Sequence, residues 1–301
     1  MNMRTSRRGA LKATAGAATF GSVMAAVESN LQAAKASGLK GNINHSVCKW
    51  CYRKIPLEQF CEAGKKMGLQ SVELLLPKDF PTLKKYDLHC AMVSFPTGKT
   101  PQGVKVGGIT RAFNRIEHHD TLLDIYEPHI KASANAGFRN IICFSGNRDG
   151  LDDEQGIKNC AIGLKRMMKL AEKHDVTITM ELLNSKVNHK DYQCDHTEWG
   201  VELCKAVGSE RFKLLYDIYH MQIMEGDVIA TIRKYHDYFS HYHTGGVPGR
   251  NEIDETQELY YPAICKTIVE TGFKGFLAQE FIPKRKDQLA SLKQGVTICD
   301  V

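Results

Sequence analysis

Short β-rich segments alternate with longer helical segments along most of the chain, and this alternation constrains the fold more than any other feature. Each of the short segments is rich in β-branched, aromatic or other apolar residues and has the length of a strand. Regular alternation of strand and helix is typical of βα units that build a parallel sheet. The eight expected strands are 42–47, 71–75, 88–94, 140–144, 176–181, 213–217, 238–244 and 275–280.

The segments between these strands have the apolar spacing of amphipathic helices. Gly68, Gly137 and Gly272 follow three of them, as expected of glycines that end a helix. No linker, repeat or low-complexity stretch divides residues 41–301, so we expect one catalytic domain there. A doubly wound sheet would need a glycine-rich phosphate loop after its first strand, and none is present, so the sequence predicts a (β/α)8 TIM barrel. The expected helices include 57–67, 111–136, 156–174, 197–206, 227–235 and 261–271.

Polar side chains stand at the ends of the last four expected strands. A TIM barrel carries its chemistry at the carboxyl ends of its strands. Three of these strands end on a carboxylate and one ends on an imidazole; in chain order the residues are Glu181, Asp217, His243 and Glu280. One acidic residue at a strand end is commonly a helix cap, but four successive ends indicate a site. An oxygen-rich set with one nitrogen suits Mn²⁺, Mg²⁺ or Co²⁺, so we expect one divalent ion there.

Four further side chains are expected at the same mouth. His220, just beyond the sixth strand, is placed either to hydrogen-bond a bound oxygen or to cap a helix. Arg250 ends a glycine-rich loop and is a candidate for a substrate carboxylate, which arginine binds bidentately; a solvated position is the alternative. Trp50 and Glu73 are expected to line the substrate pocket, although Trp50 would also suit the core. His241 is expected to point to the opposite side of its strand and is left out of the site.

The first 36 residues have the features of an export signal. Arg7 and Arg8 form a twin-arginine pair, and residues 13–26 are small or apolar and carry no charge. The pattern resembles a bacterial Tat signal, so we expect a periplasmic protein with the Tat translocon as a transient partner. The uncharged stretch is too short and too rich in alanine and glycine to span a bilayer comfortably, so stable membrane insertion is not expected.

The charge of the chain gives little support to a nucleic-acid partner. The formal net charge is +6, and the first 36 residues hold +4 of it. The remainder carries 35 basic and 33 acidic side chains, which is too balanced to indicate a basic groove. We therefore expect a small-molecule partner and no nucleic acid, and the sequence leaves open whether the protein is a homo-oligomer.

The ten cysteines do not indicate a disulfide framework. Most of them, such as Cys90 and Cys143, lie in apolar runs where cysteine behaves as a small core residue. Cys48 and Cys51 form a close pair, but no second pair stands at zinc-finger spacing. The sequence leaves open whether this pair binds a metal, forms a disulfide or simply packs.

Five stretches carry a resemblance to a known family: residues 68–81, 181–184, 217–227, 247–252 and 279–283. Through them, residues 41–285 resemble the hydroxypyruvate isomerase group of the xylose isomerase-like TIM barrels, a superfamily of sugar isomerases and epimerases. The resemblance implies that the four strand-end residues bind one divalent metal and that Glu181 and Glu280 also move protons. Bacterial hydroxypyruvate isomerases tend to have glutamine at the position of His243, whereas ketose 3-epimerases of the superfamily have histidine.

The expected chemistry moves a carbonyl along a small α-hydroxy carbonyl compound. A proton leaves one carbon, an enediolate forms and a proton returns to the adjacent carbon, while a divalent ion neutralises the developing charge. The expected reaction converts hydroxypyruvate to tartronate semialdehyde. The alternatives are a ketose 3-epimerase or a related sugar or inosose isomerase, and, outside enzymes, an exported sugar-binding barrel. A phosphodiester-cleaving relative would need more His and Asp ligands than the strand ends supply.

Overall fold

The computed structural model describes residues 38–301. The twin-arginine pair and the rest of the expected export signal, residues 1–36, lie outside the described residues. Within residues 38–301, every helix falls short of the length and apolar character needed to cross a bilayer.

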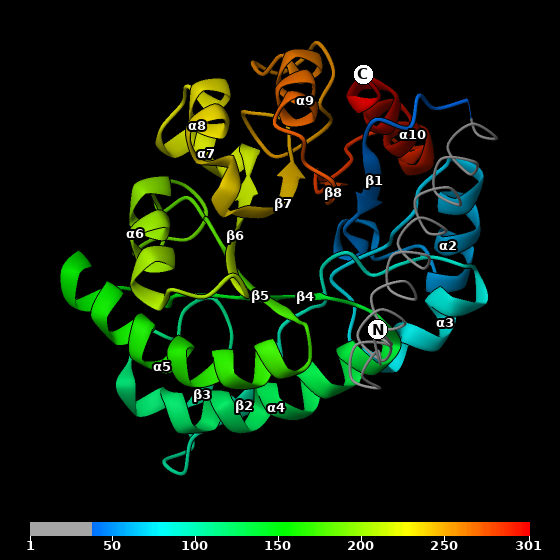
Figure 1. Ribbon diagram of the computed structural model, residues 1–301. Coiled ribbons are helices and arrows are strands. Elements are labelled where there is room, and N and C mark those ends of the chain that lie inside the picture. The colour runs from blue at the N-terminus through cyan, green and yellow to red at the C-terminus, as the bar shows by residue number, and fades with distance from the viewer. Residues whose placement is uncertain (1–37) are drawn as a thin grey trace, which may run out of the picture.

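Six parallel strands form the main sheet of the described chain. They pair in the order β1-β8-β7-β6-β5-β4, and each pairing is parallel. Figure 1 shows the strands around the centre of the molecule and the helices outside them. This arrangement confirms the predicted α/β barrel architecture. The strands are β1 Asn44–Val47, β4 Asn140–Cys143, β5 Thr177–Glu181, β6 Phe212–Asp217, β7 Phe239–Thr244 and β8 Phe276–Gln279.

Two extended segments, residues 71–75 and 89–93, lie between β1 and β4 and complete the barrel. They are the second and third expected strands, but they are joined to each other and to their neighbours by isolated parallel bridges. These bridges pair Cys48 with Glu73, Ser71 with His89, Leu75 with Val93, and Val93 with Ile141. Leu74 has a φ of 55°, and this left-handed conformation interrupts the extended backbone between two bridges. The segments therefore close the barrel without forming continuous ladders.

The helices surround the strands, as Figure 1 shows. Five of them match expected helices closely, and Gly137 adopts the predicted left-handed conformation at the end of α4, with a φ of 84°. The short strands β2 Gly98–Lys99 and β3 Lys105–Val106 pair as a separate antiparallel hairpin. The helices are α2 Leu57–Lys66, α3 Phe80–Lys85, α4 His119–Ala136, α5 Asp153–Lys173, α6 Thr197–Val207, α7 Ile218–Met224, α8 Val228–Tyr235, α9 Tyr261–Glu270 and α10 Gln288–Cys299.

Four helices differ from the predicted set. The helix expected over 111–136 begins at His119, because residues 111–115 form a loop and residues 116–118 a short 3₁₀ turn. The helices α3 and α7 are 6 and 7 residues long, too short to show helical periodicity in a sequence. The fourth, α10, follows the last expected strand and was not among the expected helices; it packs closely on the barrel, since a Cβ added at Gly295 would lie 2.8 Å from the Phe281 ring.

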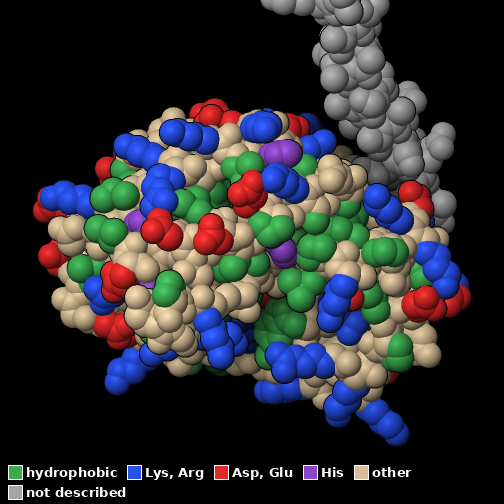
Figure 2. Space-filling model, turned by 90° about the horizontal axis from the view of Figure 1, so that it is seen from below, with side chains coloured by type: hydrophobic (Ala, Val, Ile, Leu, Met, Phe, Trp, Pro, Cys, Tyr) green, Lys and Arg blue, Asp and Glu red, His purple; other side chains and the backbone are tan. Residues whose placement is uncertain are grey.

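All ten cysteines of the sequence are buried free thiols. The prediction that most of them pack as small core residues is therefore confirmed. Cys48 and Cys51 are not joined by a disulfide. On the face in Figure 2, acidic and basic side chains are interspersed over much of the surface, and Lys and Arg predominate near a hollow lined by hydrophobic side chains.

Candidate metal centre

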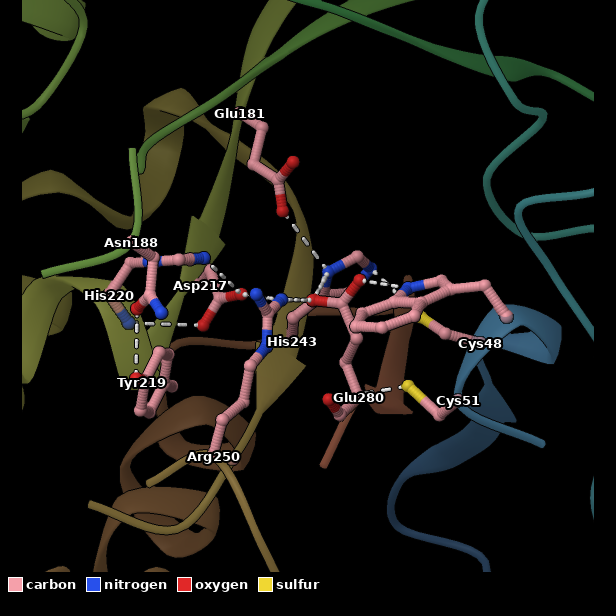
Figure 3. A network of polar contacts seen from close by, with 12 residues as sticks. Cys48, Cys51, Glu181, Asn188, Asp217, Tyr219, His220, His243, Arg250 and Glu280 are labelled. Carbon is pink, nitrogen blue, oxygen red and sulfur yellow. Dashed lines mark hydrogen bonds and ion pairs between the residues drawn. The ribbon is translucent and has the colours of Figure 1, made fainter. Parts of the chain in front are cut away.

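Four side chains converge at the carboxyl ends of β5, β6, β7 and β8. Each is buried, and each offers one ligand atom that lies within 4.8 Å of the ligand atoms of the other three. Figure 3 shows the four side chains facing one another. The structure thus brings together the residues that the strand ends indicate. We call them the quartet: Glu181, Asp217, His243 and Glu280.

Strand and helix ends orient the side chains of the quartet. His243 Nδ1 lies 2.8 Å from Glu280 Oε2 and 3.4 Å from Glu181 Oε1. Asp217 is the N-cap of α7, and its Oδ1 accepts the backbone N–H of His220 at 3.2 Å. One oxygen of Asp217 is thereby used to begin the helix, and Oδ2 remains for the site.

The donor set fits a divalent cation. Oε1 of Glu181 is buried and has no hydrogen-bond partner among the described residues. A buried carboxylate oxygen without a partner is costly, and a bound cation would compensate it. Three carboxylates and one imidazole are ligands of the kind that Mn²⁺, Mg²⁺ and Co²⁺ accept. The quartet can therefore hold one such ion.

The two glutamates of the quartet have different electrostatic environments. Burial raises the pKa of Glu181. Burial acts in the same direction on Glu280, but the Arg250 guanidinium and the His243 imidazole outweigh it and hold the pKa of Glu280 well below its usual range. Burial opposes the charged form of His243, but contacts with Cys48, Glu280 and Glu181 raise its pKa well above 6.5. In the metal-free protein His243 is therefore protonated.

Arg250 lies against the quartet between two aromatic rings. Its guanidinium carbon is 5.3 Å from the ring centroid of Trp50 and 5.3 Å from that of Tyr219. Nη2 donates to Asp217 Oδ2 at 3.2 Å and also to Glu280 Oε2. The side chain is 11% exposed, which excludes a solvated loop position. Its Nε is buried without a partner in the described chain, so one N–H remains for a bound acceptor.

His220 presents one defined hydrogen-bond donor. Its Nδ1 accepts the backbone N–H of Asn184 at 3.1 Å, so this nitrogen carries no proton. Burial lowers the pKa of His220 well below 6.5, so the ring is neutral and its proton resides on Nε2. Nε2 is buried, has no partner among the described residues and lies 3.6 Å from Asp217 Oδ2. An N–H donor is therefore available beside the quartet.

Trp50 and Glu73 occupy different levels of the barrel. Trp50 is half-buried, and its Nε1 donates to Glu280 Oε1 at 2.7 Å, which places the indole at the site. Glu73 is 0% exposed, and its Oε1 lies 2.9 Å from His243 Nε2, on the side of the ring away from the quartet. The expectation that Glu73 lines the substrate pocket is therefore corrected: the imidazole separates its carboxylate from the mouth.

The expectation that His241 points away from His243 is also wrong. Residues two apart on a strand point to the same side. His241 Nε2 lies 2.8 Å from Glu73 Oε1, and the two imidazole centroids are 5.0 Å apart. Cys48 Sγ is 3.6 Å from His243 Nε2. Cys48, Glu73 and His243 form a second group of potential metal ligands.

Sequence reasoning missed Asn184 and Tyr219, which act on predicted site residues. Asn184 fixes the tautomer of His220, and Tyr219 stacks on Arg250 and donates its hydroxyl to Asn188 Oδ1 at 2.9 Å. Both residues lie within three positions of a strand end, and this position was the feature of the sequence that could have indicated a place in the site. Their contacts depend on loop conformations that a sequence pattern does not encode.

The structure is thus an α/β barrel with a buried cluster of carboxylates and one imidazole at its strand ends. The family model described as the xylose isomerase-like TIM barrel matches residues 61–297. The chain belongs to this family.

Curated relatives of the chain carry isomerase names. It is 26% identical to hydroxypyruvate isomerase of Escherichia coli K12 over 74% of this chain and 86% of that protein. It is 32% identical to 2-oxo-tetronate isomerase of Cupriavidus necator over 36% of this chain and 41% of that protein. The alignment with a human relative likewise spans 44% of that protein.

Solved structures share the fold at low sequence identity. The crystal structure of AP endonuclease, family 2, from Brucella melitensis matches with a TM-score of 0.72 at 23% identity, covering 85% of this chain and 98% of that one. The D-psicose 3-epimerase of Clostridium cellulolyticum matches with a TM-score of 0.66 at 16% identity, covering 86% of this chain and 100% of that one. These likenesses concern the barrel fold.

Proposed function

We propose that the protein is a divalent-metal-dependent isomerase that moves a carbonyl along a small α-hydroxy carbonyl substrate. The observation that carries the proposal is the quartet, with the unpartnered Oε1 of Glu181 on one side and the unpartnered Nε2–H of His220 beside it. Carbonyl movement needs a base and an electrophile that stabilises the enediolate, and a bound cation together with a hydrogen-bond donor can supply the second. The names of the curated relatives support an isomerase of this kind.

The side chains of the site have distinct proposed roles. The quartet would hold the ion, which supplies a Lewis acid for the carbonyl and hydroxyl oxygens of the substrate. Glu181 removes the proton from carbon with the carboxylate oxygen that does not face the ion, because Trp50 and Arg250 donate to Glu280 and leave the Glu181 carboxylate without such hydrogen bonds. Glu280, which accepts hydrogen bonds from Trp50 and Arg250, returns a proton or carries it between carbons. His220 donates its Nε2–H to a substrate oxygen.

Arg250 favours a substrate with a carboxylate. Its Nη2 donates to the quartet, whereas its Nε–H has no hydrogen-bond partner among the described residues. A carboxylate could accept this N–H, and the stacked aromatic rings hold the guanidinium plane in place. Hydroxypyruvate carries such a carboxylate, and its isomerisation product is tartronate semialdehyde. We therefore propose hydroxypyruvate isomerisation as the first reaction to test.

A ketose 3-epimerase or related sugar or inosose isomerase is the second candidate. It is favoured by His243, since the resemblance described above associates histidine at this position with ketose 3-epimerases. In that case Arg250 would serve chiefly as the partner of Asp217 and Glu280, which it already contacts. A neutral sugar would not need the free Nε–H.

Proton NMR in D₂O with Mg²⁺-loaded protein distinguishes the candidates. Hydroxypyruvate and a panel of neutral ketoses and inososes are incubated separately, with Glu181→Gln protein and buffer alone as controls for spontaneous exchange. We expect deuterium at C3 of hydroxypyruvate and aldehyde product signals, both lost with EDTA and restored by Mg²⁺. Exchange at C3 of a ketose would select the 3-epimerase, and exchange at C1 would select a sugar isomerase. The absence of both exchange and product formation with every compound would reject an isomerase and favour a binding barrel.

A further inference from the structure

We propose that Glu73 is a positioning residue that fixes the orientation and tautomer of His243, and thereby sets the metal affinity of the quartet. The inference rests on the proposed metal site, but the residue to which it assigns a role, Glu73, lies outside the quartet. Glu73 comes from the second expected strand, and its backbone bridges to Cys48 after β1. Its side chain therefore lies in the barrel interior, one level below the quartet.

The carboxylate of Glu73 is surrounded by hydrogen-bond donors. Oε1 is 2.9 Å from His243 Nε2 and 2.8 Å from His241 Nε2, and Oε2 accepts the hydroxyl of Ser46 at 2.5 Å. Cys48 Sγ lies 3.8 Å from Oε1. A carboxylate is an acceptor, so the imidazole nitrogens that face it carry protons. Both carboxylate oxygens of Glu73 therefore accept hydrogen bonds from buried donors.

The geometry of His243 follows from this contact. With a proton held on Nε2 by Glu73, Nδ1 is the nitrogen that can offer a lone pair, and Nδ1 is the one that faces Glu181 and Glu280. Histidines that bind metals commonly donate their other N–H to a carboxylate, which fixes the ring and increases its basicity as a ligand. Glu73 satisfies this requirement from within the barrel.

The burial of this cluster argues that it has a function beyond packing. Four polar side chains of this cluster are 0% exposed to solvent: Ser46, Glu73, His241 and His243. Their hydrogen bonds are made within the cluster. Barrel interiors are usually filled with branched apolar side chains, and a buried ionised carboxylate is costly without a compensating role. Because the imidazole of His243 lies between Glu73 and the mouth, Glu73 cannot act on the substrate directly.

The first test measures Co²⁺ binding by the purified protein. Calorimetry gives the dissociation constant, and the visible spectrum reports the coordination geometry of the saturated site. For Glu73→Gln we expect a roughly 10- to 100-fold loss of affinity and a changed spectrum. The matched control is Asp195→Asn, which alters another buried carboxylate, bonded to Arg148 at 2.9 Å, outside the quartet. It should leave Co²⁺ affinity and the spectrum unchanged.

Several results would overturn the inference. If Glu73→Gln is folded and keeps wild-type affinity and spectrum, Glu73 does not position His243. If wild-type protein binds two ions, and Cys48→Ser binds one, then Glu73 belongs to a second metal site. If wild-type protein binds no Co²⁺ at all, the proposed metal centre itself fails, which is distinguishable from the first result.

The second test is read on wild-type protein, and a variant serves only to assign one signal. ¹⁵N-histidine-labelled protein is loaded with Zn²⁺, and long-range ¹H–¹⁵N spectra assign the proton of each ring, with His243→Gln protein identifying the signal. We expect His243 to keep a slowly exchanging proton on Nε2 and to lose the proton on Nδ1. A proton on Nδ1 with a metal-bound Nε2 would contradict the proposal.

Discussion

Glu181 and Glu280 differ in how firmly the protein holds them. Glu280 accepts hydrogen bonds from Trp50, His243 and Arg250, whereas Oε1 of Glu181 has no partner among the described residues. Glutamine in place of either residue keeps an oxygen for the metal and a similar volume but removes the basic carboxylate. Each variant should lose roughly 10² to 10⁴ in turnover. Mn²⁺ affinity should fall modestly in both.

Steady-state kinetics and Mn²⁺ calorimetry on the two variants check this expectation. Loss of solvent exchange at one carbon in one variant would show that the residue serves a single face of the substrate. If both variants retained near-wild-type turnover on the best substrate, the glutamates would be ligands alone, and the proton-transfer mechanism would be excluded.

Metal binding should release protons from the site. The pKa of His243 is raised well above 6.5 in the metal-free protein, so a metal must displace the proton from Nδ1. Below the pKa of His243 the protonated ring disfavours the metal, and affinity for Mn²⁺ should rise by up to about 10-fold per pH unit. Calorimetry in two buffers with different ionisation enthalpies measures the protons released.

His243→Gln is the matched control for this measurement. Glutamine keeps an oxygen ligand but does not titrate, so proton release should fall in the variant. Equal proton release by both proteins would show that another group, rather than His243, gives up the proton.

Among the structural elements, the ends of β5, β6 and β7 could be predicted because one chemical pattern repeats at each. Each of these strands carries a carboxylate or an imidazole at its last or next-to-last residue, and parallel strands bring such ends to one side of the barrel. The irregularity of the second and third strands could not be predicted, because the left-handed backbone of Leu74 depends on its tertiary surroundings.

The depth of a side chain in the barrel could not be predicted from the sequence either. Glu73 and Trp50 both stand near a strand end, yet Trp50 reaches Glu280 while Glu73 lies behind His243. Two side chains near strand ends can therefore differ in depth, so that one lines the pocket and the other is buried beneath it. Arg250 was expected near the site, but its contacts with Asp217 and Glu280 depend on a loop in which its own φ is 58°.

Gly163 in α5 illustrates how packing can outweigh helix propensity. Alanine is the better helix former, but a Cβ at this position would lie 2.8 Å from the ring of His119. That ring is held in place by a 2.8 Å contact from Nε2 to the carbonyl of Phe113. Gly163→Ala should therefore lower the free energy of unfolding by roughly 1–3 kcal/mol.

Urea denaturation measures this effect, with Ile162→Ala as the control on the same helix. Ile162 is 48% exposed, so its replacement should change the free energy of unfolding little. Unchanged or increased stability of Gly163→Ala would show that His119 can move aside, which would contradict the close packing of α4 on α5.

For the whole molecule, we propose export through the Tat pathway. The paired arginines Arg7 and Arg8 are the element that the Tat receptor reads, so replacing both with lysine should abolish periplasmic recovery while keeping the charge. Fractionation with an assay for signal cleavage measures the outcome. Arg4→Lys makes the same chemical change outside the pair and should be exported normally. Undiminished periplasmic recovery of the double variant would reject the Tat assignment.

The most direct test of the account is a crystal of the protein soaked in Mn²⁺ and measured for anomalous scattering. Every proposed role depends on one ion held by the quartet. We predict a single strong anomalous peak between Glu181, Asp217, His243 and Glu280. Absence of a peak at saturating Mn²⁺, or a peak held by Cys48 and Glu73 behind His243, would contradict the central claim.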